Sequence, residues 1–180
     1  MLPIAVVIPT LNAAATLAGT CAALDGVAEI VVSDGGSSDG TRRLARRLGC
    51  RVVSAPRGRG GQLMAGIAAA RQEWLLLLHA DTRLQPGWQA AVSGHMQAGP
   101  DKAGYARFAL DSSDRRARRL ERLVAWRCRV LALPYGDQGL LVHRALLAEV
   151  GGIRPLPLME DVDLVRRLGR RRLAGLDATA

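Results

Sequence analysis

The sequence has 180 residues, enough for one domain with a sizeable core, and its 49% apolar content excludes an intrinsically disordered chain. Arg and Lys total 25 against 16 Asp and Glu, so the net charge of +9 predicts an anionic partner such as a nucleoside diphosphate or an anionic lipid. One Phe and two Tyr are too few for the aromatic platforms of single-strand binders, so nucleic acid is not expected.

The three cysteines, Cys21, Cys50 and Cys128, are odd in number and widely spaced. Such an arrangement is typical neither of a disulfide framework nor of a zinc site, and it predicts a cytoplasmic protein. The uncharged start Met1–Leu24 lacks the basic beginning of an export signal and contains two prolines, so no signal peptide is predicted.

The first half of the chain alternates predicted strands with predicted helices. Strands are predicted at Leu2–Ile8, Glu29–Ser33, Arg51–Ser54 and Trp74–Leu78, and helices at Ala13–Leu24, Arg42–Leu48 and Gln62–Arg71. Asn12 is the predicted cap of the first helix, and Ser37, Ser38 or Asp39 that of the second. This alternation predicts a mostly parallel sheet with helices on both faces, in a single domain over residues 1–180.

The second half has a weaker pattern. Predicted elements are a helix at Trp88–Gln97, a strand at Ala103–Leu110, a helix from Asp114 to Leu131 capped by Ser112 or Ser113, a strand within Gly136–Val142, a helix at Arg144–Val150 and a weakly patterned tail at Leu173–Ala180.

The helix predicted over Asp114–Leu131 carries seven arginines and a separate apolar side. One interpretation is a solvated basic face. The alternative is a membrane-surface helix that meets anionic lipids and would suit a lipid-linked acceptor.

Three polar loops follow predicted strands, at Pro9–Asn12, Asp34–Thr41 and His79–Thr82. Because the carboxyl ends of parallel strands meet at one edge, we expect these loops to line a ligand crevice. There Asp81 can hold a divalent cation against a phosphate, and Asp34 can accept hydrogen bonds from a base or ribose. The alternative is that both are turn or capping residues.

The segment Pro56–Gly61 is predicted to be a flexible basic loop. It contains Arg57, Arg59 and Gly60, which suit phosphate groups, but it lacks the ending of a P-loop.

Taken together, these segments resemble a known family. Ala5–Asn12, Asp34–Thr41, Pro56–Ala69 and Leu77–Thr82 are similar to the nucleotide-binding half of family 2 glycosyltransferases, and Gly136–Gly139 and Pro157–Leu164 extend the similarity. The resemblance implies a GT-A (Rossmann-like) fold, a nucleotide-binding half over about residues 1–100 and an acceptor and catalytic half over about 101–180. It also implies inverting, metal-dependent transfer from a nucleotide diphosphate sugar, with a UDP-sugar favoured.

The same resemblance implies the site residues. The residues assigned to the nucleotide sugar are Pro9, Thr10, Asn12, Asp34, Arg59, Gly60, Ala80 and Asp81. Asp81 is also assigned to the Mn²⁺ or Mg²⁺ ion, and Asp161 is assigned the role of general base. The acceptor side is assigned to Asp137, Gln138 and Glu160. A lipid-linked acceptor would place the protein at the inner face of a membrane.

The sequence departs from the family pattern at two positions. His79 stands where many members have a second acid, and it is either a metal ligand or a hydrogen-bonding residue at the strand end. Asp34 is followed by Gly35 where many members have two adjacent acids. Family members usually continue with a further helix, so an incomplete acceptor side is also expected.

Other interpretations remain open at this stage. Acids such as Glu160 and Asp161 also stabilise a helix N-terminus without any chemistry. A nucleotidyltransferase would need a glycine-rich basic loop after the first strand, which Pro9–Asn12 does not supply. A basic binding module and a family member that binds donor without transfer are the remaining alternatives.

Overall fold

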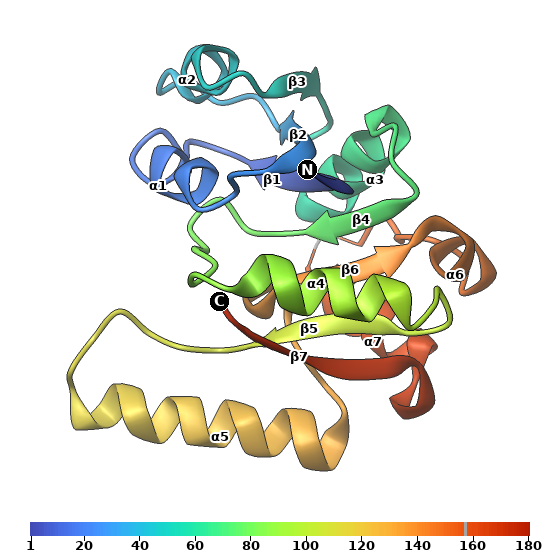
Figure 1. Ribbon diagram of the computed structural model, residues 1–180. Helices are drawn as coiled ribbons and strands as arrows, with labels where there is room; N and C mark the ends of the chain where they lie inside the picture. Colours follow the sequence, from blue (N-terminus) through green and yellow to red (C-terminus); the bar gives the residue numbers. More distant parts are fainter. Residues whose placement is uncertain (157) are drawn as a thin grey trace.

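A seven-stranded sheet runs through the molecule in the order β3-β2-β1-β4-β6-β5-β7 (Figure 1). The computed structural model describes residues 1–156 and 158–180. The strands are β1 (Leu2–Thr10), β2 (Val27–Asp34), β3 (Arg51–Ser54), β4 (Trp74–Leu77), β5 (Ala103–Arg107), β6 (Leu140–His143) and β7 (Leu173–Thr179). Strand β6 runs antiparallel to its neighbours β4 and β5, whereas the other pairs are parallel. The predicted mostly parallel α/β sheet is confirmed.

The helices divide between the two faces of this sheet. They are α1 (Leu17–Ala22), α2 (Thr41–Arg47), α3 (Arg59–Ala69), α4 (Trp88–Gln97), α5 (Arg115–Leu131), α6 (Arg144–Glu149) and α7 (Glu160–Leu168), with 3₁₀ turns at Gly136–Gln138 and Arg170–Arg172. Buried side chains of α1, α2 and α4 pack into one hydrophobic cluster, and those of α3, α6 and α7 pack into another. Helix α5 lies apart from both groups, along the β5–β7 end of the sheet (Figure 1).

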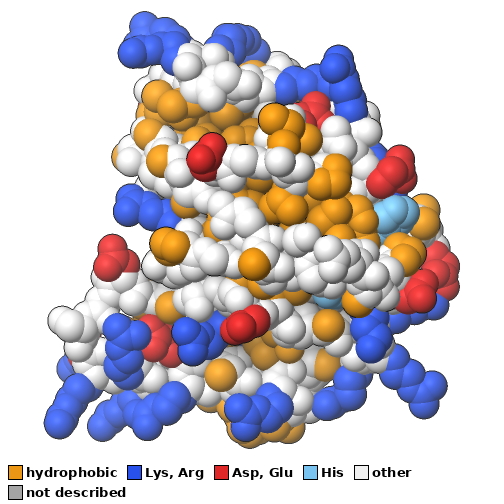
Figure 2. Space-filling model, viewed as in Figure 1, with side chains coloured by type: hydrophobic (Ala, Val, Ile, Leu, Met, Phe, Trp, Pro, Cys, Tyr) orange, Lys and Arg blue, Asp and Glu red, His pale blue; other side chains and the backbone are white. Residues whose placement is uncertain are grey.

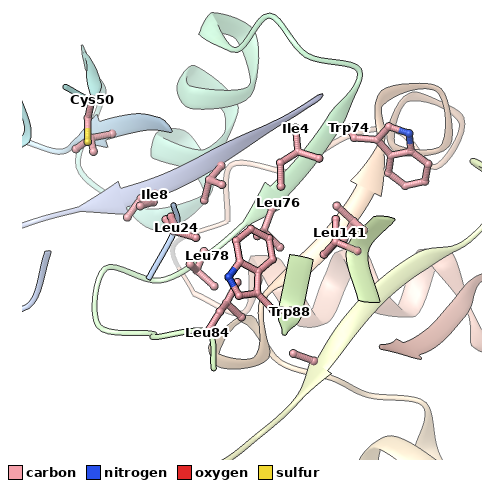
Figure 3. Close-up of a cluster of buried hydrophobic side chains, with 14 of the residues drawn as sticks. Ile4, Ile8, Leu24, Cys50, Trp74, Leu76, Leu78, Leu84, Trp88 and Leu141 are labelled. Carbon is pink, nitrogen blue, oxygen red and sulfur yellow. The ribbon is translucent and has the colours of Figure 1, made fainter. Parts of the chain in front are cut away.

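Strand β1 shows why the sheet is covered on both sides. Its residues from Ile4 to Thr10 are all buried. Alternate residues belong to different clusters: Ile4 and Val6 lie in the first cluster, which Figure 3 shows around Trp88, and Ala5 lies in the second. A strand that is buried on both faces is a nearly continuous apolar run, as β1 before Thr10 and all of β4 are.

The first helix begins later than predicted. The amides of Ala13 and Ala14 are bound by Thr41 Oγ1 at 2.8 Å and Asp39 Oδ2 at 3.0 Å, so this segment forms a turn before α1. Asn12 does not cap the helix, because its Oδ1 accepts a hydrogen bond from the amide of a neighbouring loop, and its φ is 53°. The prediction of a helix from Ala13 was therefore wrong.

The third helix begins earlier than predicted, at Arg59 rather than Gln62. The glycines that suggested a flexible loop form its first turn. A Cβ atom on Gly60 would lie 2.6 Å from the carbonyl oxygen of Arg154, so glycine at this position permits close helix packing.

Several other boundaries differ from the predictions. Strands β4 and β5 end at Leu77 and Arg107, before their predicted ends. Helix α2 begins after Gly40, and Asp39, one of its predicted caps, accepts from the amide of Thr41 at 3.0 Å. Helix α5 is capped by Asp114, whose carboxylate accepts from the amide of Arg116 at 2.8 Å.

The predicted tail at Leu173–Ala180 is instead strand β7, which pairs in parallel with β5. No helix within the described ranges has both the length and the apolar character needed to cross a bilayer.

Candidate functional site

A cleft of about 580 Å³ lies beyond the carboxyl ends of β1 and β4, where the sheet topology predicts a ligand site. Its walls come from the loops after β1 and β4, from the segment that leads into α3, and from Leu158. Six of the predicted donor-site residues line it: Pro9, Thr10, Asn12, Arg59, Ala80 and Asp81.

Asp34 organises the loop beside this cleft. Its carboxylate is 1% exposed and accepts hydrogen bonds from the hydroxyl of Thr10 at 3.1 Å, from the amide and hydroxyl of Ser37 at 3.0 and 2.5 Å, and from the amide of Gly36 at 3.1 Å. Burial by itself would raise the pKa of Asp34, but these hydrogen bonds outweigh it and hold the pKa below its ordinary value. The ionised carboxylate therefore fixes the loop that follows β2.

Gln62 is a structural residue that the sequence did not single out. Its buried amide donates to the carbonyl of Thr10 at 2.5 Å and to that of Ser33 at 3.2 Å, so it links the ends of β1 and β2 at the cleft. A polar residue in a predicted Ala-rich helix carries no sequence signal for this role, because the partners are backbone carbonyls 52 and 29 residues away.

Arg59 connects His79, which lines the cleft with it, to the buried side chain of Glu160. Arg59 Nη1 lies 3.2 Å from His79 Nε2, and Arg59 Nε lies 3.6 Å from Glu160 Oε1. Arg59 is a donor only, so Nε2 is the acceptor and the proton of the neutral ring is on Nδ1. Burial first, and then the charge of Arg59, lower the pKa of His79 and favour this neutral form. The contact supports the hydrogen-bonding interpretation of His79.

Glu160 contributes a buried carboxyl group beside Arg59. Its side chain is 1% exposed, and neither carboxylate oxygen has a hydrogen-bond partner in the described parts of the chain. The guanidinium of Arg59 is the cation that faces it, so Glu160 acts on the cleft through Arg59 rather than by lining it.

Asp161 meets His79 across Gly136. The amide of Gly136 donates to Asp161 Oδ2 at 2.7 Å. A Cβ atom on Gly136 would lie 2.6 Å from His79 Nε2 and 3.2 Å from Asp161 Oδ2. The absence of a side chain at this position thus lets a carboxylate from α7 approach the imidazole that follows β4.

A second cleft, of about 550 Å³, adjoins the first and shares Thr16 and Asp81 with it. Asp137 lines this second cleft, and its Oδ1 has no hydrogen-bond partner among the described residues. Burial raises the pKa of Asp137, although the nearby charge of Arg127 acts in the opposite direction. Asp81 therefore lies between the two clefts, each of which is lined by further acidic or basic residues.

Gln138 and Glu160, the other residues predicted for the acceptor side, line neither of these two clefts. The buried amide of Gln138 donates to the carbonyl of Ala106 at 2.8 Å, and its oxygen accepts from the amide of Tyr135 at 3.2 Å. These contacts hold the turn that carries Asp137.

Asp81 is exposed, and its carboxylate forms no hydrogen bond or ion pair with residues 1–156 or 158–180. The same residues contain no cluster of three or more His, Cys, Asp or Glu side chains that could hold a metal ion. Asp81 fits a cation that takes most of its oxygen ligands from a bound phosphate, because Mg²⁺ is commonly held by one or two carboxylates and substrate phosphates.

The Glycosyl transferase family 2 model matches residues 5–149 of the chain. No curated protein is significantly similar to it in sequence.

Solved glycosyltransferases share its fold. The structure of S. aureus TarS 1-349 is similar over the whole chain, with a TM-score of 0.77 and 14% identity. Glucosyl-3-phosphoglycerate synthase from Mycobacterium tuberculosis, in complex with Mn²⁺, UDP and glucosyl-3-phosphoglycerate, is similar over 96% of the chain, with a TM-score of 0.64 and 23% identity. Mannosyl-3-phosphoglycerate synthase from Rubrobacter xylanophilus is similar over 97%, with a TM-score of 0.66 and 21% identity. The chain spans 60%, 68% and 64% of these three structures.

Proposed function

The chain belongs to glycosyl transferase family 2, and on that premise we propose that it transfers a sugar from a nucleoside diphosphate sugar to an acceptor hydroxyl, with inversion at the anomeric carbon. The observation that carries the proposal is that Asp161 and His79 both lie beside Gly136 and line one pocket, and that His79 also lines the 580 Å³ cleft. One cleft is then the donor site, and the other receives the acceptor.

The donor lies in the 580 Å³ cleft, with its base against the loop after β1 and its diphosphate between Arg59 and Asp81. Asp34 shapes this loop from behind and holds Thr10 in place. A UDP-sugar is the first donor to test, because glucosyl-3-phosphoglycerate synthase, which shares the fold, was solved with UDP and Mn²⁺.

Asp161 is the general base of the proposed reaction. The N–H groups of Gly136 and Val162 orient the carboxylate by donating to Oδ2 and Oδ1, and one lone pair on each oxygen remains for the proton of an acceptor hydroxyl. As that hydroxyl attacks the anomeric carbon, its proton moves to Asp161 and the nucleoside diphosphate departs on the opposite side.

Charge on the leaving diphosphate is met by Arg59, which Glu160 and His79 hold in place. Asp81 would hold a Mn²⁺ or Mg²⁺ ion, which when bound supplies further neutralisation of the phosphate oxygens. His79 stays neutral in this arrangement and positions Arg59 by accepting its hydrogen bond.

The acceptor hydroxyl enters through the 550 Å³ cleft, beside Asp137. A cytoplasmic location belongs to the same proposal: Cys21 and Cys50 are free thiols although their sulfur atoms lie 3.7 Å apart, as expected in a reducing compartment.

Calorimetric titration with UDP, GDP and their sugars, with and without Mn²⁺, tests the donor site. We expect one diphosphate to bind in a metal-dependent way and Asp81→Ala to abolish the dependence. Asp101→Ala, an exposed acid away from both clefts, is the matched control and should bind like the wild type.

Failure of every nucleotide to bind the wild type would refute the proposal. Donor binding without transfer to any of a panel of hydroxyl acceptors would instead identify a donor-binding family member.

A further inference from the structure

Helix α5 exposes an unusual amount of apolar surface. Of its 17 residues, Ala117, Val124 and Cys128 are buried. Five large apolar side chains remain exposed: Leu120, Leu123, Trp126, Val130 and Leu131. Single exposed apolar residues are ordinary, but five on one helix form a patch that calls for a partner.

The exposed apolar residues form a stripe along the helix. Leu120, Leu123, Trp126 and Val130 follow one another at intervals of three or four residues, which places them along one side of α5. Leu123 is 60% exposed and Trp126 is 52% exposed, so the centre of the stripe faces solvent.

Arginines surround this stripe. Helix α5 carries seven of them, Arg115, Arg116, Arg118, Arg119, Arg122, Arg127 and Arg129, against one acid, Glu121. Glu121 pairs with Arg118 at 2.6 Å, whereas Arg119 and Arg122 have no ion pair with a described residue. Figure 2 shows the resulting basic edge of the molecule at the end that α5 occupies in Figure 1.

We propose that α5 is a membrane-surface helix that lies on a bilayer containing anionic lipid. Leu123, Trp126 and Val130 would enter the boundary between headgroups and acyl chains, and the arginines would meet lipid phosphates. A helix with a polar, Arg-rich face and a Trp- and Leu-bearing face is the kind that binds in this way. This contact does not depend on the sugar-transfer chemistry proposed above.

The charge of the helix favours a bilayer over a second copy of the chain. Packing two α5 helices together would bring fourteen arginines against two acids, and no other acid on this helix would offset them. Nucleic acid would satisfy the arginines but would leave Leu123 and Trp126 without an apolar environment. An anionic bilayer satisfies both sets of side chains.

Contact of α5 with a bilayer would also determine how the 550 Å³ cleft is oriented relative to the membrane surface. Helix α5 ends at Leu131, and Arg127 in its last turns packs over the ring of Tyr135, just before Asp137. A bilayer beneath α5 would therefore lie near the cleft that we assign to the acceptor, a consequence that rests on the proposed function.

Tryptophan fluorescence with phospholipid vesicles tests this proposal directly. Trp74 and Trp88 are 9% and 1% exposed, so Trp126 is the tryptophan that a bilayer can reach. We expect vesicles of phosphatidylcholine with about one third phosphatidylglycerol to shift the emission to shorter wavelength and to sediment the protein. Pure phosphatidylcholine vesicles should do much less, and Trp126→Phe should remove the spectral shift.

Two pairs of variants separate the apolar from the basic contribution. Leu120→Asp with Leu123→Asp, and Arg119→Glu with Arg122→Glu, should each weaken sedimentation at least tenfold. The matched controls lie elsewhere on the surface: Leu48→Asp with Met64→Asp replaces two residues of similar exposure, and Arg46→Glu with Arg47→Glu makes the same charge change on α2. Both control pairs should bind like the wild type.

Thermal melts would establish that each variant is folded. The proposal is overturned if the wild type does not bind anionic vesicles, or if the α5 pairs and the control pairs weaken binding equally. It is also overturned if the wild type is a dimer that Leu120→Asp with Leu123→Asp dissociates, because the stripe would then be covered by a second copy.

Discussion

Asp161 and His79 come from opposite halves of the chain and meet across Gly136, whose amide donates to the carboxylate at 2.7 Å. A methyl group at Gly136 would lie 2.6 Å from His79 Nε2, a distance at which one of the two groups must move. The glycine thus controls how closely the base and the imidazole approach each other.

Gly136→Ala should slow transfer by on the order of 10²-fold while leaving donor affinity nearly unchanged, because displacement of a reacting group by about 1 Å has effects of this size. Steady-state kinetics alongside calorimetry with the donor would check this. Gly94→Ala in α4 is the control, since a Cβ atom there meets nothing within 4 Å. Equal activity of the two variants would contradict the importance of this approach.

Asp161→Asn should lower turnover by on the order of 10²- to 10⁴-fold, since the amide keeps the size of the side chain but cannot take a proton. Donor binding should persist. Asp163→Asn provides the comparison on the same helix, because it removes ion pairs to Arg154 and Arg167 rather than the base. A wild-type rate in Asp161→Asn would remove this residue from the chemistry.

Gln62→Met should destabilise the protein by about 1–3 kcal/mol, because the carbonyls of Thr10 and Ser33 each lose a buried donor with little change in side-chain volume. Urea unfolding would measure the difference. Gln97→Met, at the exposed end of α4, should change stability little. If both variants are equally stable, Gln62 does not hold the two strand ends together.

The lowered pKa of His79 predicts a pH dependence of stability. The unfolded chain binds a proton at this residue below about pH 6.5, while the folded protein resists protonation, so this residue makes the free energy of unfolding fall as the pH drops below that value. His79→Gln should reduce the slope of the free energy of unfolding against pH by at most about 1.4 kcal/mol per pH unit. Urea unfolding between about pH 5 and pH 7.5 would measure it.

The control for this pH experiment is His95→Gln, which removes a different imidazole, in α4. His95→Gln should retain more of the pH dependence of the free energy of unfolding than His79→Gln does. Identical slopes in the wild type and His79→Gln would show that His79 is not the group responsible.

The sequence predicted the elements whose side chains carry a clear pattern. Strand β3 (Arg51–Ser54) and helix α4 (Trp88–Gln97) have the predicted bounds. The residues on either side of each favour neither a strand nor a helix. The position of the first cleft was also predictable, since it follows from parallel strands ending at one edge.

Other features depend on contacts that no local pattern encodes. Strand β7 is only partly buried, so Leu173–Thr179 shows little alternation. The helical start at Arg59 depends on close packing of Gly60 against Arg154, more than ninety positions away. The burial of Glu160 and the contact between Arg59 and His79 likewise arise only when the two halves are assembled.

The pairing of β5 with β7 has a consequence for synthesis of the protein. Strands β1 to β4 are contiguous in the chain and adjoin in the sheet, so they can assemble while later residues are still being made. Strand β5 must wait for residues 173–179 before one of its edges is paired. During translation the unpaired N–H and C=O groups of this edge are open to mispairing with other chains, so the nascent protein passes through an interval in which a chaperone would protect it.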